Sequence, residues 1–183
     1  SNLIHLNICD AVIVGGVDTL CHLTLNGFRA LELLSNGVSN PFSLNRDGLN
    51  IGEGAALFVL EKTSGTINLC GVGESCDAYH ASAPDPTGEG AIASMENALE
   101  SALLKPDEIG YLNLHGTGTL LNDMMEAKAV DTLFNGVPCS SVKPLIGHCL
   151  GAAGAMETGV CWLMLNTDES KRLMPTHRWD GVT

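Results

Sequence analysis

Three short apolar runs stand out in the first part of the chain, at residues 10–16, 54–61 and 67–72. Continuous apolar runs of this length are typical of strands that are buried on both faces. We therefore predict three buried strands, the first of which ends in a turn at its glycine pair. Between the first two runs, a helix is predicted from apolar residues at helical spacing, which are Phe28, Leu31 and Leu34.

The rest of the chain alternates between helical and strand-like patterns. Helical periodicity covers residues 90–104, 123–134 and 151–165, and short strands are predicted at 111–114 and near Cys139. Strands separated by helices of this length favour βαβ crossovers with parallel pairing. We therefore expect an α/β fold with largely parallel sheets and helices on both faces.

The size and composition of the chain are those of one packed, soluble domain. Its 183 residues are 45% hydrophobic and 16% charged, so it can bury a core and has too few charges for a disordered tail or a coiled coil. A polar turn at residues 63–65 is the best candidate for an internal boundary. It separates a first part, residues 1–62, from a second part, residues 66–183.

The charge balance argues against a nucleic-acid partner. Nine Lys and Arg against 21 Asp and Glu give a net charge of -12, so a phosphate backbone would be repelled. Aromatic residues make up 4% of the chain, which is too few for a platform on which bases stack.

Cysteine usage and the first residues favour the cytoplasm. The seven cysteines are an odd number spread through apolar segments, which is typical of free thiols in a reducing compartment. Cys70 and Cys76 are close in sequence, but no second close pair of cysteines completes a zinc site. No apolar run approaches the roughly 20 residues that span a bilayer. The first residues also lack the basic region of a secretory signal. We expect a cytoplasmic protein with no membrane partner and no bound metal.

Two histidines follow neighbouring predicted strands. His115 comes directly after the strand at 111–114 and opens the sequence HGTGT, and His148 follows the strand near Cys139, at the end of SSVKPLIGH. Ligands of α/β folds bind outside the carboxyl ends of parallel strands, so we expect the two imidazoles to converge there. Lys143 precedes His148 closely enough to reach the same cleft.

Paired imidazoles suit one kind of chemistry better than others. Two neutral imidazoles that donate to one oxygen form an oxyanion hole, which stabilises an enolate. HGTGT lacks the spacing and the following Lys of a phosphate loop, and it is not the GxGxxG of dinucleotide-binding proteins. A lone histidine after a strand is more often an ordinary loop residue, so this interpretation depends on there being two.

The other polar residues near this pair are interpreted as structural. We expect Asp123 to cap the helix after HGTGT, with Glu126 in its first turn. Met124 and Met125 are expected in the core. His80 is expected to be a structural residue or a residue on the rim of the cleft, and not a base. Three further histidines have no partner that the pattern identifies: His5, His22 and His177.

Five sequence blocks occur along the chain in an order and spacing that point to one family. The blocks are DAVIVGG at 10–16, RDG at 46–48 leading into IGEGAALFVLE, CDAYH at 76–80, HGTGT followed by Asp123, and SSVKPLIGH followed by CLGAAGA and Glu157. Together, and over nearly the whole chain, they resemble the β-ketoacyl-ACP synthases, the decarboxylating condensing enzymes of the thiolase-like superfamily. The segments CWLML and HRWDG are similar to synthases of the aryl-polyene type.

This resemblance implies a partial thiolase-like fold. Residues 1–62 would form the end of the N-terminal half of a synthase, and residues 66–183 most of the C-terminal half. Members of the family are acyltransferases of fatty acid or polyketide and polyene biosynthesis. They condense an acyl group held on a cysteine with malonyl-ACP and release carbon dioxide.

The resemblance also assigns roles to particular residues. His115, His148 and Lys143 match the positions that serve decarboxylation. Thr117 and Thr119 would hydrogen-bond the phosphopantetheine arm of an acyl carrier protein, which is the implied partner, and no cofactor of the protein's own is implied. Metal ligands are not implied either. Glu157 would be a buried carboxylate near Lys143.

Two departures from the family pattern limit what this chain is expected to do. The family's nucleophilic cysteine lies at a strand-to-helix elbow, and neither Cys9 nor Cys149 stands in that context. The closing strands of the family have no counterpart after Thr183. We therefore expect a fragment that is inactive in ketoacyl synthesis by itself. Uncovered strand edges would favour a homodimer or a hetero-oligomer.

Two alternatives stay open at this point. The chain could be a non-catalytic partner subunit, like the chain-length-factor subunits that pair with an active synthase, although such a subunit has no need of His115, His148 and Lys143. It could also be a thiolase or another non-decarboxylating acyltransferase, although HGTGT combined with the lysine and GH pattern looks like the decarboxylating branch.

Overall fold

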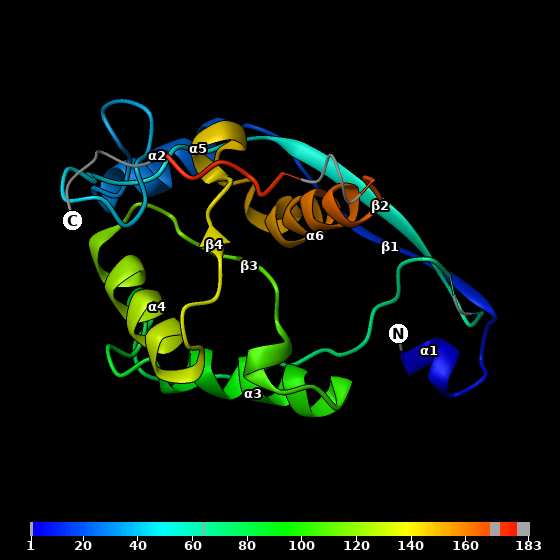
Figure 1. Cartoon of the computed structure of the whole chain (residues 1–183). Helices are drawn as coiled ribbons and strands as arrows, with labels where there is room; N and C mark the ends of the chain where they lie inside the picture. Colours follow the sequence, from blue (N-terminus) through cyan, green and yellow to red (C-terminus); the bar gives the residue numbers. More distant parts are fainter. Residues whose placement is uncertain (1, 64, 169–172, 179–183) are drawn as a thin grey trace.

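The computed structural model describes residues 2–63, 65–168 and 173–178, and its elements alternate between helix and strand. Figure 1 shows a long two-stranded ribbon with one helix against it, and two further helices on the opposite side of a pair of short strands. In chain order, the elements are α1 (Asn2–His5), β1 (Ala11–Asp18), α2 (His22–Ala30), β2 (Gly54–Glu61), α3 (Glu89–Ala102), the 3-10 turn η1 (Pro106–Glu108), β3 (Leu112–Asn113), α4 (Leu120–Leu133), β4 (Cys139–Ser140), α5 (Lys143–Ile146), the 3-10 turn η2 (Leu150–Ala152) and α6 (Ala153–Leu165).

The β3–α4–β4 segment is a parallel βαβ unit, as the alternating pattern predicts. Leu112 pairs with Cys139 and Asn113 with Ser140, and α4 forms the crossover between the two strands. This unit agrees with the predicted α/β class. α3 packs beside α4, so both helices lie on the same side of the short strands (Figure 1).

The ribbon of β1 and β2 differs from the predicted parallel pairing, because its strands are antiparallel. Ala11 pairs with Glu61 at one end and Asp18 with Gly54 at the other. The predicted turn at the glycine pair is wrong as well, since β1 runs straight through it. Gly16 serves helix–strand packing and not a turn. A Cβ on Gly16 would lie 2.6 Å from the carbonyl oxygen of Gly151, so the absence of a side chain here allows η2 to pack against the strand.

The two ribbon strands are half-buried instead of buried on both faces. Their exposure alternates residue by residue, because α6 and η2 cover one face only. The exposed face carries large apolar side chains, namely Ile13, Val17, Leu57 and Val59. The prediction of strands from the continuous apolar runs is therefore confirmed, whereas the prediction that both faces of these strands are buried is wrong in this chain.

The third predicted strand, residues 67–72, is extended but joins no sheet. A Cβ on Gly71 would overlap the carbonyl oxygen of Ala98, and one on Gly73 would overlap that of Ser94. The backbone of this segment therefore lies directly on α3, and contact with the helix takes the place of a ladder with β3.

The helices begin and end within a few residues of the predicted bounds. α2 ends at Ala30, so Leu31 and Leu34 lie beyond it, and the last predicted helix begins as η2 before α6. α4 begins at Leu120, earlier than predicted, which changes the role of its carboxylates as described below. No helix in the described part of the chain is long and apolar enough to cross a membrane.

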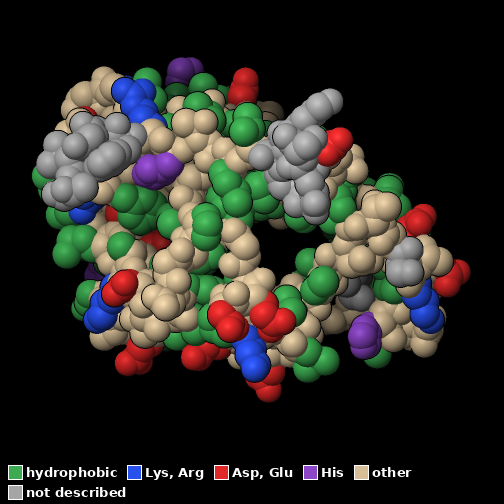
Figure 2. Space-filling view, in the orientation of Figure 1, with side chains coloured by type: hydrophobic (Ala, Val, Ile, Leu, Met, Phe, Trp, Pro, Cys, Tyr) green, Lys and Arg blue, Asp and Glu red, His purple; other side chains and the backbone are tan. Residues whose placement is uncertain are grey.

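The most buried residues surround the loops at the ends of β3 and β4, and many of them are polar. They are Ser39, Asn40, Ser43, Thr117, Asp123, Ser140, Ser141 and Lys143. Large apolar side chains are exposed elsewhere, and Figure 2 shows them scattered over the visible face, where carboxylates outnumber cationic side chains. The best-packed part of the chain is therefore a polar loop cluster, in which the candidate residues lie.

Candidate active site

His115 and His148 meet in space, with ring centroids 5.1 Å apart and rings nearly perpendicular at 85°. His115 lies two residues after the end of β3, and the amide of Leu114 between them donates to the Ser140 carbonyl of β4. His148 is held from the other part of the chain, because its amide donates to the Asn50 carbonyl at 2.7 Å. The structure therefore brings together the two histidines that the sequence singles out.

Lys143 lies between this histidine pair and α6. It is the first residue of α5 and is only 2% exposed. Its ammonium group donates to the carbonyl oxygen of His115 at 2.5 Å, lies 3.3 Å from the Nδ1 atom of the same residue and forms an ion pair with Glu157. Glu157 is thus the partner of Lys143 that the resemblance implies, and the pair connects α5 to α6.

The hydrogen bonds fix which ring nitrogen of each histidine carries its proton. The Nδ1 atom of His148 accepts the amide hydrogen of Leu150 at 3.3 Å, and the Nδ1 atom of His115 faces the Lys143 ammonium. Each Nδ1 is therefore an acceptor, so in a neutral ring the proton is on Nε2. The site presents two Nε2–H donors.

Both imidazoles are neutral near pH 7. Desolvation is the largest cause, followed by the charge of Lys143 and the nearby His148, and together they lower the pKa of His115 to about 3, although one side of this residue is open to solvent. Desolvation and then Lys143 lower the pKa of His148 to about 4. A pair of neutral donors beside a fixed cation is suited to an oxygen atom that develops negative charge.

Glu126 fixes the start of the HGTGT loop, a role that the sequence did not suggest. Its carboxylate accepts the amide hydrogens of His115 at 2.6 Å and of Gly116 at 2.7 Å. Burial raises the pKa of this carboxyl group, and the two amides oppose that rise. A carboxylate in mid-helix with no cation three or four residues away was the available signal for such a contact.

Asp123 does not cap α4, so the predicted cap is wrong. The helix begins one turn earlier, with Thr119 at the N-cap position. Asp123 is 1% exposed and accepts amide hydrogens from Phe42 at 2.8 Å and Gly118 at 3.2 Å, and the Arg46 guanidinium lies 3.9 Å away. This carboxylate therefore joins two loops. Met124, predicted in the core, is 59% exposed.

Ser141, which the sequence analysis also missed, joins the HGTGT loop to the segment that carries Lys143. Its hydroxyl donates to the Gly116 carbonyl at 2.7 Å and accepts the Lys143 amide hydrogen at 3.3 Å, and the residue is fully buried. Small polar side chains before a buried lysine were the only hint in the sequence. This one hydroxyl therefore links the backbones of the two loops.

Thr117 and Thr119, the predicted substrate-binding pair, lie side by side in the same loop. Their Oγ1 atoms are 2.8 Å apart, and Thr117 is buried, with its carbonyl accepting the hydroxyl hydrogen of Ser39. The loop passes this close to Ser39 because residue 118 is a glycine with φ at +82°. The two hydroxyls are thus positioned as a pair.

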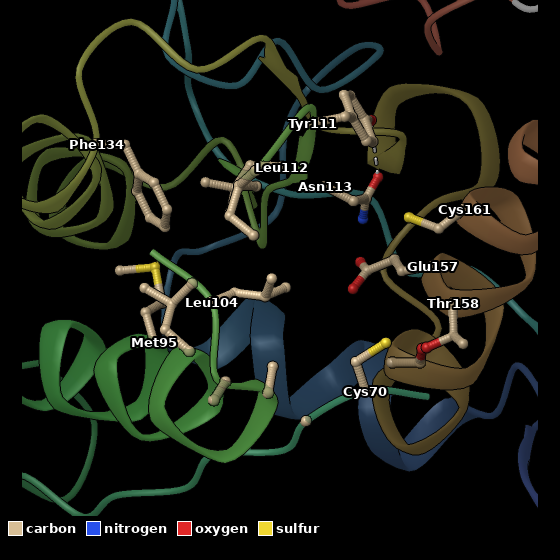
Figure 3. Close-up of a pocket in the computed structure, with 16 residues that line it drawn as sticks. Cys70, Met95, Leu104, Tyr111, Leu112, Asn113, Phe134, Glu157, Thr158 and Cys161 are labelled. Atoms are coloured by element: carbon tan, nitrogen blue, oxygen red, sulfur yellow. Dashed lines mark hydrogen bonds between the residues drawn. The ribbon is translucent and has the colours of Figure 1, made fainter. Parts of the chain in front are cut away.

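A cavity of 530 Å³ is lined in part by Glu157, but not by Lys143 or by either imidazole. Figure 3 shows Glu157 and Thr158 of α6 on one side of it, Asn113 of β3 facing them, and apolar side chains lining the remainder. Tyr111 also lines it, and its hydroxyl lies 2.7 Å from the Ser140 hydroxyl. The cavity therefore borders the ion pair and not the imidazoles.

Cys149 follows His148 in sequence but does not face it as a nucleophile. Its thiol is buried and lies 3.5 Å from the Ile146 carbonyl oxygen, and burial raises its pKa. A thiolate is the reactive form, so this cysteine is not activated. All of the cysteines are free thiols, and the described residues contain no group of three His, Cys, Asp or Glu placed to hold a metal ion.

Solved structures place the chain in the thiolase-like class of α/β folds. A chain of the structure "Ketosynthase (ApeO) in Complex with its Chain Length Factor (ApeC) from Xenorhabdus doucetiae" is 50% identical, with a TM-score of 0.92, and the match covers 96% of this chain and 44% of that one. A chain of "AntDE:AntF (apo): type II PKS acyl-carrier protein in complex with its ketosynthase bound to the hexaketide" is 29% identical, with a TM-score of 0.83, over 90% of this chain and 45% of that one.

Family models and curated relatives agree with this class. Residues 1–65 match the beta-ketoacyl synthase N-terminal domain and residues 67–176 the beta-ketoacyl synthase C-terminal domain. The chain belongs to the β-ketoacyl synthase family. The 3-oxoacyl-[acyl-carrier-protein] synthase 2 of Coxiella burnetii is 38% identical over 90% of the chain, and the putative mitochondrial synthase of Schizosaccharomyces pombe is 38% identical over 86%. The chain spans 44% and 42% of these relatives.

Proposed function

We propose that this chain carries the malonyl-decarboxylating site of a β-ketoacyl-ACP synthase. The observation that supports this most directly is the pair of Nε2–H donors on His115 and His148 beside the buried Lys143. In decarboxylation, the bond between C2 and the free carboxylate of a malonyl thioester breaks, and carbon dioxide leaves. The electron pair of that bond moves onto C2 and the thioester oxygen. Two donors aimed at this oxygen would stabilise the resulting enolate.

Lys143 acts in this proposal through position and charge. Its ammonium group holds the carbonyl and the ring of His115, and its charge helps to keep both imidazoles neutral. Glu157 neutralises the ammonium on the side away from the imidazoles. Because the thioester carbonyl of the malonyl group itself accepts the electron pair, this decarboxylation requires no cofactor as an electron sink.

Condensation needs one more group than these residues supply. The enolate carbon must attack an acyl thioester, which the family holds on a nucleophilic cysteine. Cys149, the cysteine next to the site, has a buried thiol whose pKa is raised, so it does not suit this role. We therefore propose that this polypeptide decarboxylates malonyl thioesters, that C2 of the enolate then takes a proton from water to give an acetyl thioester, and that no ketoacyl product forms on this polypeptide alone.

The substrate is proposed to arrive on the phosphopantetheine arm of an acyl carrier protein. Thr117 and Thr119 offer adjacent hydroxyls next to His115, which is suitable for the amide groups of that arm. A carrier protein in complex with its ketosynthase is what the AntDE:AntF structure is named for, and the relatives are named for acyl-carrier-protein substrates.

The test is release of carbon dioxide from malonyl-ACP. We expect His148→Ala to lower the rate about 100-fold or more, since removal of one oxyanion donor commonly costs that much. His5→Ala is the matched control, because His5 is an exposed histidine on α1, on the opposite side of the molecule from α5 (Figure 1), and it should leave the rate unchanged. Equal rates for wild type and His148→Ala would reject the proposal.

A second candidate is a partner subunit of the chain-length-factor kind. Two of the similar solved structures are named as complexes of a ketosynthase with its chain length factor, and Cys149 is not activated. In that case the chain would bind an intact ketosynthase, and His148→Ala would change neither the complex nor its product. Decarboxylation that depends on His148 excludes a purely structural subunit.

A further inference from the structure

His177 lies against the candidate site, although the sequence identified no partner for it. It belongs to residues 173–178, which we call the strap, and which Figure 1 shows in red beside α5. The Nδ1 atom of His177 accepts the amide hydrogen of Ser141 at 3.3 Å. Two residues earlier, the carbonyl of Pro175 accepts the hydroxyl hydrogen of Ser140 at 2.9 Å. The strap is therefore bonded to two successive residues at the end of β4.

The ring of His177 also contacts a second loop. Its centroid lies 6.0 Å from that of Phe42, with the rings tilted by 45°. The amide of Phe42 is held by Asp123, and its φ of +62° is a conformation that a bulky residue seldom adopts unless its surroundings fix it. His177 thus bridges the end of β4 and the loop that Asp123 secures.

Ser141 transmits this contact to the site. Its amide is bonded to His177, while its hydroxyl is bonded to the Gly116 carbonyl and to the Lys143 amide. Gly116 follows His115, and Lys143 contacts the ring of His115. A shift of the Ser141 backbone would therefore move both groups that determine where the His115 ring points.

We infer that His177 is a positioning residue of the decarboxylating site, which holds Ser141 so that His115 and Lys143 keep their mutual geometry. The inference rests on the function proposed above. Within the described residues, the hydrogen bond and the ring contact of His177 go to Ser141 and Phe42 and not to the imidazole pair, so its effect on that pair passes through Ser141. Because Nδ1 must accept a hydrogen for this role, His177 has to be the Nε2–H tautomer.

Three variants of the full chain test this inference. His177→Phe keeps a ring against Phe42 and removes the acceptor, whereas His177→Asn places an amide oxygen near the position of Nδ1. His22→Phe is the control, because His22 is an exposed histidine on α2. The readouts are amide exchange at Ser141, the ring nitrogen signals of His115 in NMR spectra, and malonyl-ACP decarboxylation.

We expect His177→Phe to speed exchange at Ser141 about tenfold and to shift the His115 ring signals, which follows from the loss of one buried hydrogen bond. The kcat of decarboxylation should fall about five- to tenfold at a nearly unchanged KM. His177→Asn should restore most of each value, and His22→Phe should change none of them. Unchanged exchange and unchanged His115 signals in His177→Phe would overturn the inference, and so would equal defects in the Phe and Asn variants.

The two NMR measurements, amide exchange at Ser141 and the ring signals of His115, test this inference independently of the proposed function. If the wild-type chain releases no carbon dioxide, the proposed function fails, while the exchange rates and the His115 signals still decide the role of His177. Should His177→Phe fail to fold, the wild-type spectrum decides by itself. A His177 ring protonated on Nδ1 at about pH 7 cannot accept the Ser141 hydrogen and would overturn the inference.

Discussion

Lys143 and Glu157 form an ion pair that joins the first residue of α5 to the middle of α6. The side chain of Lys143 is 2% exposed and that of Glu157 is 15% exposed, so neither charge is well hydrated. Buried ion pairs give little net stability compared with apolar replacements, but removal of one partner leaves an uncompensated charge.

Removal of the carboxylate should therefore destabilise the chain strongly. We expect Glu157→Leu to lower the free energy of unfolding by about 3 kcal/mol, measured by urea denaturation. The double variant Lys143→Met with Glu157→Leu should recover most of this loss. Glu100→Gln, at an exposed position on α3, serves as the control and should have little effect. A single Glu157→Leu variant as stable as wild type would show that the pair is solvated.

Acid should weaken the fold through the two histidines. The folded-state pKa values of His115 and His148 are lowered from 6.5 to about 3 and about 4. The unfolded chain therefore binds more protons in the window between these values and 6.5, so stability is highest above the unfolded pKa and falls as the pH drops through that window.

The measurement is the urea midpoint at about pH 7 and about pH 5, compared with that of His115→Asn combined with His148→Asn. The double variant lacks both titrating groups, so its midpoint should change less between the two pH values than that of wild type. The same pKa values imply that decarboxylation stays active in mild acid down to about pH 4, provided that the chain remains folded. An identical pH response in the double variant would contradict the assignment.

Glu126 should be needed as a carboxylate and not merely as a polar side chain. Its two oxygens each accept one amide hydrogen, from His115 and Gly116. In Glu126→Gln, an NH₂ group would face one of these amides, so we expect the free energy of unfolding to fall by about 1–3 kcal/mol and amide exchange at Gly116 to accelerate. Glu96→Gln on α3 is exposed and provides the comparison. Unchanged exchange at Gly116 would show that water can replace the carboxylate.

Gly118 should tolerate no side chain, because two separate constraints act on it. Its φ is +82°, and a Cβ would lie 2.5 Å from the Gly48 carbonyl oxygen and would overlap the Ser39 hydroxyl. Gly136 has a similar φ of +72° with nothing within 4 Å of the corresponding position. We expect Gly136→Ala to cost about 1 kcal/mol through backbone strain alone, and Gly118→Ala to cost about 3 kcal/mol or more. Thermal denaturation of both variants separates the two effects, and equal losses would mean that Ser39 and Gly48 move aside.

Local patterns were sufficient for the elements and for the central residues of the site. The strand at residues 54–61 followed from its apolar run and the helix α4 from helical periodicity. The meeting of His115 with His148 followed from the rule that ligands gather at strand ends. Each of these predictions depends on a short stretch of chain, and the residues within that stretch are sufficient to make it.

Features that arise from contacts between distant segments could not be predicted in this way. The antiparallel partner of β1 lies more than 30 residues away, and the segment at 67–72 leaves the sheet because its glycines rest on α3. Asp123, Glu126 and Ser141 have ordinary helix or loop patterns, and their roles appear only when the amides that they bind are in place.

The hydrogen bonds between His148 and the loop before β2 limit how related sequences can be recombined. The amide of His148 donates to Asn50 and its carbonyl accepts from Gly52, and these loop residues fall within the stretch matched by the N-terminal domain model, whereas His148 falls within the C-terminal match. A chimera joined between the two matched stretches would keep each parental sequence whole and still place this histidine on a foreign loop. Recombination among relatives should therefore succeed most often when residues 50–52 and His148 come from the same parent.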